Sequence, residues 1–372
     1  MARKLKSDKA LFLATLLLVC AGVVMVYSAS AVMAMERFGH PYRFLVRQAM
    51  WTALGLGALA IVMRLDYRTY RQPAFIWTAI GVVMAALIAV LFSTPINGTR
   101  RWFAVGGFGL QPSELAKLAV IVFTAAVLER RMHRINDVRY SLLPVAIVTG
   151  LIVVLVLLEP DFGTAVAILA IVALMVFAAG IDWRYLAFTA AAAVPVCWFL
   201  LMSADYRRRR LMAFLNPWED PLGDGFQIIQ SMIAVGTGGA LGRGLMEGVQ
   251  KLFYLPEPHT DFIYAVIGEE LGLAGATVVL AAFLLISWRG LRIASRAPDA
   301  FGSLLATGLT AMIAVQALIN MSVVLGLLPT KGIPLPFVSA GGSSLVINLM
   351  GIGVLLNLSQ HASASHEVDA VA

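Results

Sequence analysis

Charged residues are scarce in this chain. Only 13% of its 372 residues are Asp, Glu, Lys or Arg, whereas soluble domains carry roughly 25%. Hydrophobic residues make up 60%, and many of them fall in uncharged stretches such as 10–28, 75–92 and 162–180. Each stretch is long enough to cross the roughly 30 Å hydrocarbon core of a bilayer. These features exclude a soluble protein and predict one that spans a membrane repeatedly.

Cysteine is also rare. Cys20 and Cys197 both lie in apolar stretches. Two such thiols exclude a disulfide framework and leave no cysteine spacing for a metal site. Internal repeats are absent on inspection, and the inverted halves of many transporters are not visible.

Basic residues exceed acidic ones, which gives a net charge of +7. They lie in short segments between apolar stretches, where Lys and Arg orient a protein in the membrane. We therefore predict no nucleic-acid partner. The basic start MARKLKSDK leads into an apolar stretch without a small-residue cleavage site, which indicates an uncleaved first span.

Ten membrane-spanning helices are predicted from the apolar stretches. Their approximate bounds are 10–30, 46–64, 74–93, 113–128, 141–159, 162–180, 184–203, 262–287, 302–326 and 343–360. With the N-terminus inside, 15 of the 28 Lys and Arg residues fall in cytoplasmic segments and six in short external loops. This asymmetry predicts that both termini are cytoplasmic.

The predicted fold class is an all-α polytopic membrane protein. We expect one transmembrane domain over residues 1–360, with a long extracytoplasmic loop at 204–261 between helices 7 and 8. The polar tail 361–372 is predicted to be disordered. The external segments 94–112, 204–261 and 327–342 hold most glycines, prolines and polar clusters, so binding and chemistry are expected on that face.

Asp261 stands where the long external loop enters the eighth helix, within KLFYLPEPHTDFIYAVIGEELG. Burial raises the pKa of a carboxylate and nearby cations lower it, so this residue suits either a general base or a metal ligand. Its position alone favours a helix N-cap. Glu269 and Glu270 lie deeper in the same helix, where carboxylates are candidates for function; we interpret both as part of a hydrogen-bonded network between helices.

A second cluster is INGTRRWFAVGGFGLQPSELAK, residues 96–117. Arg100 and Arg101 adjoin Trp102, and a guanidinium can grip phosphate with two parallel hydrogen bonds. Contact with lipid headgroups is an equally good explanation. Glu114 and Lys117 share a helix face and are expected to neutralise each other inside the bundle. The glycines Gly98, Gly106, Gly107 and Gly109, together with Pro112, indicate a tight loop.

A third cluster is LLPTKGIPLPFVSAGGSSL, residues 327–345, whose three prolines exclude a regular helix. Ser339 and Ser343 supply hydroxyls, Lys331 a cation, and the amides at the next helix start favour an anion. The alternative is a re-entrant loop that only packs. EPDFGT (159–164) is interpreted as a turn, and ADYRRRR (204–210) suits anionic headgroups or a pyrophosphate.

These motifs, in this order over residues 10–360, resemble the SEDS family, which comprises FtsW, RodA and SpoVE. NGTRRW, QPSELAK, EPDFGT, LPEPHTDFIYAVIGEELG and LPTKGIPLPFVSAGGSS carry the resemblance in combination. The LPTKG stretch is more similar to the division branch, FtsW and SpoVE, than to RodA. Ala340 departs from the family, which commonly has tyrosine there.

The resemblance implies a peptidoglycan glycosyltransferase. It would polymerise lipid II, the undecaprenyl-pyrophosphate-linked disaccharide pentapeptide, at the outer face of the inner membrane, for septal synthesis in division. Asp261 matches the family's essential aspartate, as a base or as an anchor for a divalent cation (Mg or Mn). No organic cofactor is implied. The implied substrate-binding residues are Arg101, Lys117, Glu114, Lys331, Ser339 and Ser343.

The implied partners are a class B penicillin-binding protein, an FtsI-like transpeptidase, and other divisome proteins. Two other functions compete with polymerisation: a lipid II flippase, and a scaffold that recruits the transpeptidase. A flippase needs polar groups that face both sides of the membrane, whereas the unusual loops here all fall outside. The sequence therefore favours outward-facing chemistry.

Overall fold

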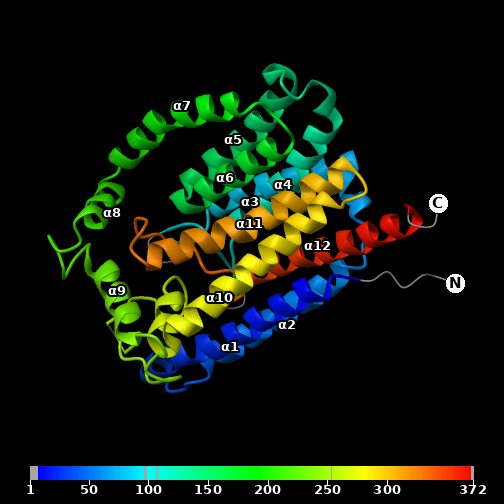
Figure 1. Ribbon diagram of the computed structural model, residues 1–372. Helices are drawn as coiled ribbons and strands as arrows, with labels where there is room; N and C mark the ends of the chain where they lie inside the picture. Colours follow the sequence, from blue (N-terminus) through cyan, green and yellow to red (C-terminus); the bar gives the residue numbers. More distant parts are fainter. Residues whose placement is uncertain (1–6, 96–98, 106–107, 253, 370–372) are drawn as a thin grey trace.

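The computed structural model describes residues 7–95, 99–105, 108–252 and 254–369. It is a bundle of long helices (Figure 1). The ten predicted helices are all present in the described residues, as α1 (Lys9–Phe38), α2 (Arg43–Val62), α3 (Pro73–Val90), α4 (Pro112–Arg131), α5 (Leu143–Leu158), α6 (Phe162–Ala178), α7 (Trp183–Met202), α10 (Ile263–Ser295), α11 (Ala300–Val324) and α12 (Gly342–Asp369). The basic start before Ser7 and the glycines Gly98, Gly106 and Gly107 lie outside the described residues.

Seven of the described helices are long and apolar enough to cross a membrane. They are α1, α2, α3, α5 with the turn before it, α10, α11 and α12. Helix α6 is apolar but shorter, and α4 carries Glu114 and Lys117 near its start. The polytopic membrane class is confirmed, and the count of ten spans stays a prediction.

The structure adds elements that hydropathy does not reveal. Strands β1 (Phe103–Val105) and β2 (Phe108–Leu110) form an antiparallel hairpin before α4. The long loop contains α8 (Asp205–Leu215) and α9 (Phe226–Gly238). Three short helical turns cover Tyr67–Arg71, Met132–Arg134 and Val138–Leu142.

Helix α12 continues to Asp369, so residues 361–369 of the tail predicted to be disordered are helical. Extending an existing helix adds one hydrogen bond for each residue fixed and needs no new nucleus, which explains why a short polar segment stays helical.

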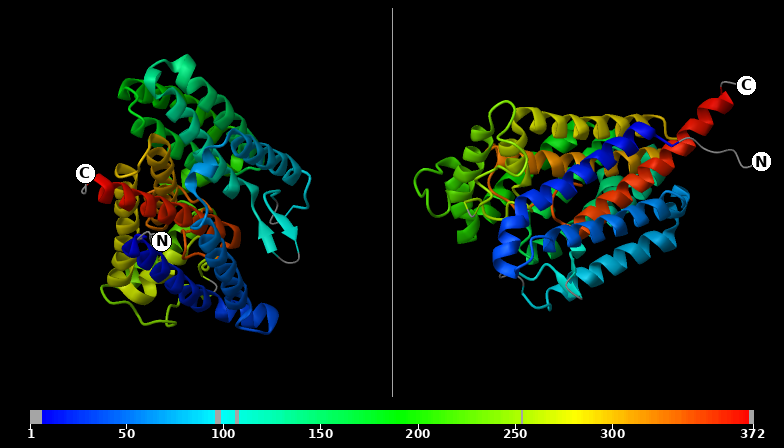
Figure 2. Two further views of the ribbon diagram at one scale, coloured as in Figure 1. Left: turned by 90° about the vertical axis from the view of Figure 1, so that its right-hand side faces the viewer. Right: turned by 90° about the horizontal axis from the view of Figure 1, so that it is seen from below.

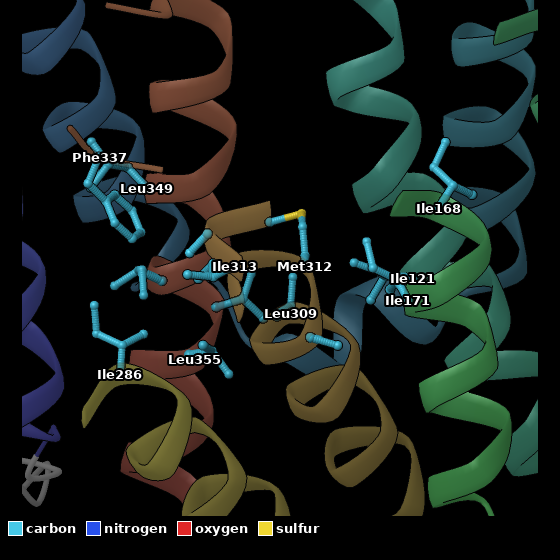
Figure 3. Close-up of a cluster of buried hydrophobic side chains, with 14 of the residues drawn as sticks. Ile121, Ile168, Ile171, Ile286, Leu309, Met312, Ile313, Phe337, Leu349 and Leu355 are labelled. Atoms are coloured by element: carbon cyan, nitrogen blue, oxygen red, sulfur yellow. The ribbon is translucent and has the colours of Figure 1, made fainter. Parts of the chain in front are cut away.

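Helix α11 lies at the centre of the bundle and contacts α4, α6, α10 and α12. Figure 3 shows its side chains among those of the neighbouring helices. The labelled residues of this core are Ile121, Ile168, Ile171, Ile286, Leu309, Met312, Ile313, Phe337, Leu349 and Leu355. All ten are buried, so α11 lies within the hydrophobic core of the bundle.

Small residues bring the helices close together. Lipid tails are as apolar as leucine, so helices in a bilayer associate through tight packing, which small residues permit. A Cβ atom at Gly308 would lie 2.6 Å from Ile121 Cγ2, and one at Gly353 would lie 2.9 Å from the Leu59 carbonyl oxygen. These glycines set the spacing of α11 against α4 and of α12 against α2.

Helix α7 stands at the edge of the bundle and arcs away from the central helices (Figure 1). Its contacts are with α6 and α8. The start of α1 and the end of α12 lie at one end of the molecule in all views (Figures 1 and 2), an arrangement compatible with the predicted ten spans.

Candidate active site

Two segments that are far apart in sequence, both predicted to be external, are bonded to each other around Asp261. The Ser339 hydroxyl donates to the Thr260 carbonyl at 2.6 Å and accepts from the Leu335 amide at 2.8 Å. The Ala340 amide donates to the His259 carbonyl at 2.9 Å. These bonds join the 327–341 loop to the residues that precede α10, and the buried Ser339 side chain links the two segments.

Asp261 is partly buried at this junction. Its backbone carbonyl accepts from Asn320 Nδ2 at 2.8 Å, and the same amide donates to the Ile333 carbonyl at 2.7 Å. The N-cap of α10 is Phe262, and no side chain caps that helix. The N-cap interpretation of Asp261 is therefore wrong, and its carboxylate is left for another role.

The surroundings of Asp261 suit a proton acceptor. Burial raises the pKa of its carboxyl to about 7, and the charge of Glu257 adds to the rise. The Arg210 charge and, more weakly, Arg101 lower the pKa, while Asp161 raises it. A group that titrates near neutral pH can take up and release a proton under physiological conditions.

Arg101 is pinned to the turn between α5 and α6. Its Nε donates to the Glu159 carbonyl at 2.8 Å and one terminal nitrogen donates to the Pro160 carbonyl at 2.6 Å. Together the two bonds fix the orientation of the planar guanidinium group, including its other terminal nitrogen. The side chain is partly exposed, so a fixed cation is presented at this turn.

The EPDFGT segment has the predicted turn structure. Asp161 is the N-cap of α6 and accepts from the Thr164 amide at 3.2 Å and hydroxyl at 2.8 Å. Gln111 Nε2 donates to the same carboxylate at 2.9 Å. The turn is thereby bonded to the start of α4.

Glu159 has an unexpected environment. Its side chain is fully buried, and neither oxygen accepts a hydrogen bond within the described residues. Burial, together with the nearby charge of Asp161, raises the pKa of Glu159 to about 8, and the Arg101 charge partly opposes this rise. The carboxyl is therefore mostly protonated at neutral pH. The one feature of the sequence that indicates this buried carboxyl is the position of Glu159 directly after an apolar stretch.

Lys331 of the external loop extends toward the start of α6. Its Nζ lies 4.4 Å from the centroid of the Phe162 ring, within the range of a cation–π contact. Phe162 is the first residue of α6, directly after the turn that holds Arg101. The structure thus brings Lys331 and Arg101 to neighbouring parts of one region.

Glu114 and Lys117 form the predicted buried pair. Their charged groups are 2.9 Å apart, and Lys117 also donates to Gln316 Oε1 at 3.0 Å. Gln316 Nε2 in turn donates to the Ser344 hydroxyl at 3.3 Å. Both members are only 2% exposed, so they lie inside the bundle and not on its surface. Ser343 is equally buried, and its hydroxyl has no hydrogen-bond partner in the described part of the chain.

Glu269 and Glu270 belong to a hydrogen-bonded network, as predicted. Glu270 pairs with Lys251 at 2.5 Å and accepts from Ser28 at 2.7 Å. Glu269 accepts from the amides of Val249 and Gln250 at 2.8 and 3.2 Å. The sequence did not single out Lys251, although two buried carboxylates require a nearby cation.

No group of three or more His, Cys, Asp or Glu side chains in the described residues is arranged to hold a metal ion. The charge of Asp161 acts on Asp261, but the Asp161 carboxylate already accepts hydrogen bonds from Thr164 and Gln111. At most one other of these side chains would therefore join Asp261 in holding a metal ion. Such a donor set fits Mg²⁺ carried by a phosphate substrate, because Mg²⁺ is often held by one or two carboxylates with phosphate oxygens and water.

Comparison with known proteins gives consistent matches over almost the whole chain. A family model described as "Cell cycle protein" (FtsW, RodA, SpoVE) matches residues 8–364. A protein of Geobacter sulfurreducens, "Probable peptidoglycan glycosyltransferase FtsW", is 46% identical over 95% of each chain. "Stage V sporulation protein E" of Bacillus subtilis is 43% identical over 97% of this chain and 99% of its own.

Two solved structures are similar in fold. One, described as "Structural coordination of polymerization and crosslinking by a peptidoglycan synthase complex", has a TM-score of 0.80 and 32% identity, covering 96% of this chain and 99% of that chain. The rod shape determining protein RodA of Thermus thermophilus has a TM-score of 0.71 and 28% identity, with 96% and 97% covered.

Proposed function

Since the chain belongs to the FtsW/RodA/SpoVE family of cell cycle proteins and is a peptidoglycan glycosyltransferase, we propose that it polymerises lipid II with Asp261 as its catalytic base. One observation carries the assignment of the base. Asp261 is a partly buried carboxylate that caps no helix and has a pKa of about 7. Its backbone is fixed by Asn320, so the carboxylate is pre-positioned.

In the proposed step, the 4-hydroxyl of the acceptor disaccharide attacks the anomeric carbon of the donor. The new carbon–oxygen bond forms as the bond from that carbon to the pyrophosphate oxygen breaks. Undecaprenyl pyrophosphate leaves with the electron pair, and Asp261 accepts the hydroxyl proton. A positioned base of this kind contributes roughly 10²- to 10⁴-fold to the rate.

The leaving pyrophosphate needs positive charge. Arg101 offers a guanidinium that is oriented by two backbone carbonyls, and Lys331 lies nearby over Phe162. Fixed cations stabilise charge as it develops, without reorganisation during the reaction. Glu114 and Lys117 support the bundle behind this region as a neutralised pair. Ser339 holds the loop that carries Lys331 through its bonds to Leu335 and Thr260, and Ser343, in the first turn of α12, stays a predicted substrate-binding residue.

Asp261 is the residue that would hold a divalent cation (Mg or Mn), and such an ion would supply charge neutralisation of the leaving group. The chain's own part would be to place the Asp261 carboxylate and to add the Arg101 charge. Asp261 serves either as base or as metal anchor, and the pH dependence described below separates the two.

We propose further that the protein works in the inner membrane at the division septum, with a class B penicillin-binding protein of the FtsI type and other divisome proteins. Similarity to a peptidoglycan synthase complex that couples polymerisation and crosslinking supports a crosslinking partner. The identity with FtsW and stage V sporulation proteins, higher than that with RodA, supports the division branch.

Polymerisation of labelled lipid II by the purified protein tests this function. Asp261→Asn is expected to lose polymer, whereas Asp220→Asn is expected to retain it. Asp220 is an exposed carboxylate of the same long loop, and among the described residues its side chain accepts only from the nearby amides of Gly223 and Asp224. Retained translocation of lipid II without polymerisation by the wild type would favour a flippase, and retained polymerisation by Asp261→Asn would exclude the proposed base.

A further inference from the structure

Helix α10 is broken at Gly272, two residues after the buried pair Glu269 and Glu270. Gly272 has φ 66° and ψ −165°, a conformation that is strained for any residue with a side chain. The break divides α10 into a short N-terminal half, residues 263–271, and a long remainder. Asp261 lies two residues before the short half.

A segment of the external loop fills the break. In an unbroken helix the carbonyls of Glu269 and Glu270 would accept from the amides four residues later. Here they accept from Arg243 and Gly244, both at 3.0 Å. The displaced amides of Leu273 and Ala274 donate instead to the carbonyls of Gly239 and Ala240, at 2.9 and 3.0 Å. Residues 239–244 are thus inserted into the hydrogen-bond ladder of α10.

The insertion requires very close backbone approach. A Cβ atom at Gly242 would lie 2.1 Å from the Glu270 carbonyl oxygen, and one at Gly238 would lie 1.9 Å from the Gly268 carbonyl oxygen. Backbone atoms stand on the other side of both contacts, so a side chain at either position cannot be accommodated without moving the segment. The arrangement is specific to glycine at these positions.

Buried charge then fastens the next part of the loop to the same short half-helix. Glu270 accepts from the Met246 amide at 3.0 Å and pairs with Lys251 at 2.5 Å. Lys251 also donates to the Ser28 hydroxyl of α1 at 2.9 Å. Glu270 is fully buried and Lys251 is 5% exposed. Separating such a pair leaves an uncompensated buried charge, so this contact holds the half-helix in one place.

We infer that Lys251 is a positioning residue for Asp261 and acts through Glu270 and the inserted backbone of the α10 break. The inference rests on Asp261 as the proposed base. The short half-helix is too short to be held by its own hydrogen bonds alone. Its C-terminal end is fixed by the Lys251–Glu270 pair and by residues 239–244, and its N-terminal end carries Asp261. A shift at the fixed end therefore moves the carboxylate against the 327–341 loop.

The test compares Lys251→Met with Arg289→Met in the full-length protein. Arg289 pairs with Asp8 at 2.6 Å at the opposite end of the same helix, so its loss breaks an ion pair without reaching Asp261. We expect both variants to melt at lower temperature. Lys251→Met is expected to lose about tenfold or more in kcat for labelled lipid II polymerisation with KM changed little, whereas Arg289→Met keeps kcat within about twofold.

Two further readouts distinguish positioning from simple destabilisation. Loosening the half-helix hydrates Asp261 and lowers its pKa, so the acid limb of the pH–kcat profile of Lys251→Met is expected to move to lower pH. Lys251→Arg, which keeps the charge, is expected to recover part of kcat, and it carries the same test if Lys251→Met cannot be purified.

An unchanged kcat and pH profile in Lys251→Met, with Asp261→Asn inactive, would overturn this inference and leave the proposed function standing. The same would follow if Arg289→Met lost as much kcat as Lys251→Met. Full activity of Asp261→Asn would instead overturn the proposed function itself.

Discussion

The carboxylate of Asp261 lies directly against the backbone of Gly332. A Cβ atom at Gly332 would come within 2.7 Å of Asp261 Oδ2. The atom that must yield is the end of a side chain, so a methyl group there would displace the carboxylate and leave the backbone in place. This relationship allows the position of the proposed base to be changed without removing it.

Gly332→Ala is expected to lower kcat for lipid II polymerisation by about tenfold to a hundredfold, because sub-ångström to 1 Å misplacement of a catalytic group has effects of that size. Gly341→Ala is the matched control in the same loop, since its Cβ would lie 3.4 Å from Pro334 Cβ, an ordinary contact. Gel analysis of labelled glycan products measures both. Equal rates in the two variants would contradict the proposed placement of the reactive carboxylate.

The rate of polymerisation should depend on pH through Asp261. Burial raises the pKa of Asp261 to about 7, and a general base acts only when it is ionised. The rate is therefore expected to fall about tenfold for each pH unit below 7 and to level off above it. If Asp261 only anchors a metal, the acid limb will instead move with the metal concentration, and this dependence is measured by repeating the profile at several concentrations.

Glu159 should make stability depend on pH in the opposite sense to an ordinary ion-paired carboxylate. Its folded pKa of about 8 lies above the usual value of 4.5, so the folded state holds a proton that the unfolded state releases. Stability from this group is then complete at low pH and is lost as the pH rises from about 4.5 to about 8.

Glu159→Gln removes that dependence. Its melting temperature is expected to match the wild type near pH 5 and to exceed it near pH 8, with a difference in unfolding free energy on the order of 3 kcal/mol. Thermal melts of the two proteins at both pH values measure this. A constant difference across the range would show that Glu159 is not the group responsible.

Arg101 should act through its fixed guanidinium. Arg101→Lys keeps the charge but cannot bond both the Glu159 and Pro160 carbonyls in the same plane. We expect it to lower kcat/KM by about tenfold. Arg100→Lys is the neighbouring control, because Arg100 is exposed and donates only to the Leu91 carbonyl at 3.0 Å among the described residues. Similar losses in both variants would show that the two bonds from Arg101 to the Glu159 and Pro160 carbonyls are not the cause of the loss.

The buried Glu114–Lys117 ion pair is expected to stabilise the folded protein, since neither charge lies at the surface. Lys117→Met leaves the Glu114 carboxylate unpaired and is expected to lower stability by about 3–5 kcal/mol. The double variant Glu114→Gln/Lys117→Met is expected to recover most of this loss. Melting temperatures test it; a double variant as unstable as the single one would show that Lys117 stabilises the bundle mainly through Gln316.

The helices and the polar clusters could be predicted from the sequence because their signals are local. Apolar stretches gave all ten helices, and the i, i+3 spacing gave the Glu114–Lys117 pair. The turn at 159–164 also followed from its residues, with Asp161 as the N-cap. The role of Asp261 could not be predicted from its position, which suggested a helix N-cap. The structure shows that the N-cap of α10 is Phe262 and that no side chain caps this helix.

The long-range links had no signal in the sequence. The bonds from Ala340 to His259 and from Arg243 to Glu269 join backbone atoms, which every residue has. The partner of Glu270 could have been sought, because a buried carboxylate needs a cation, but several cations in the long loop were possible partners. The break at Gly272 was equally hidden, since glycine within an apolar helix is common in membranes.

Polymerisation of labelled lipid II by Asp261→Asn, with lipid II translocation measured in the same proteoliposomes, tests the central claim most directly. Asn keeps the size of the side chain and removes the base, and a melting temperature at pH 8 no lower than that of the wild type will show that the fold is intact. We predict that polymer falls by about a hundredfold or more while Asp220→Asn remains active. Polymer yield from Asp261→Asn equal to that of the wild type would contradict the assignment of Asp261 as the catalytic base.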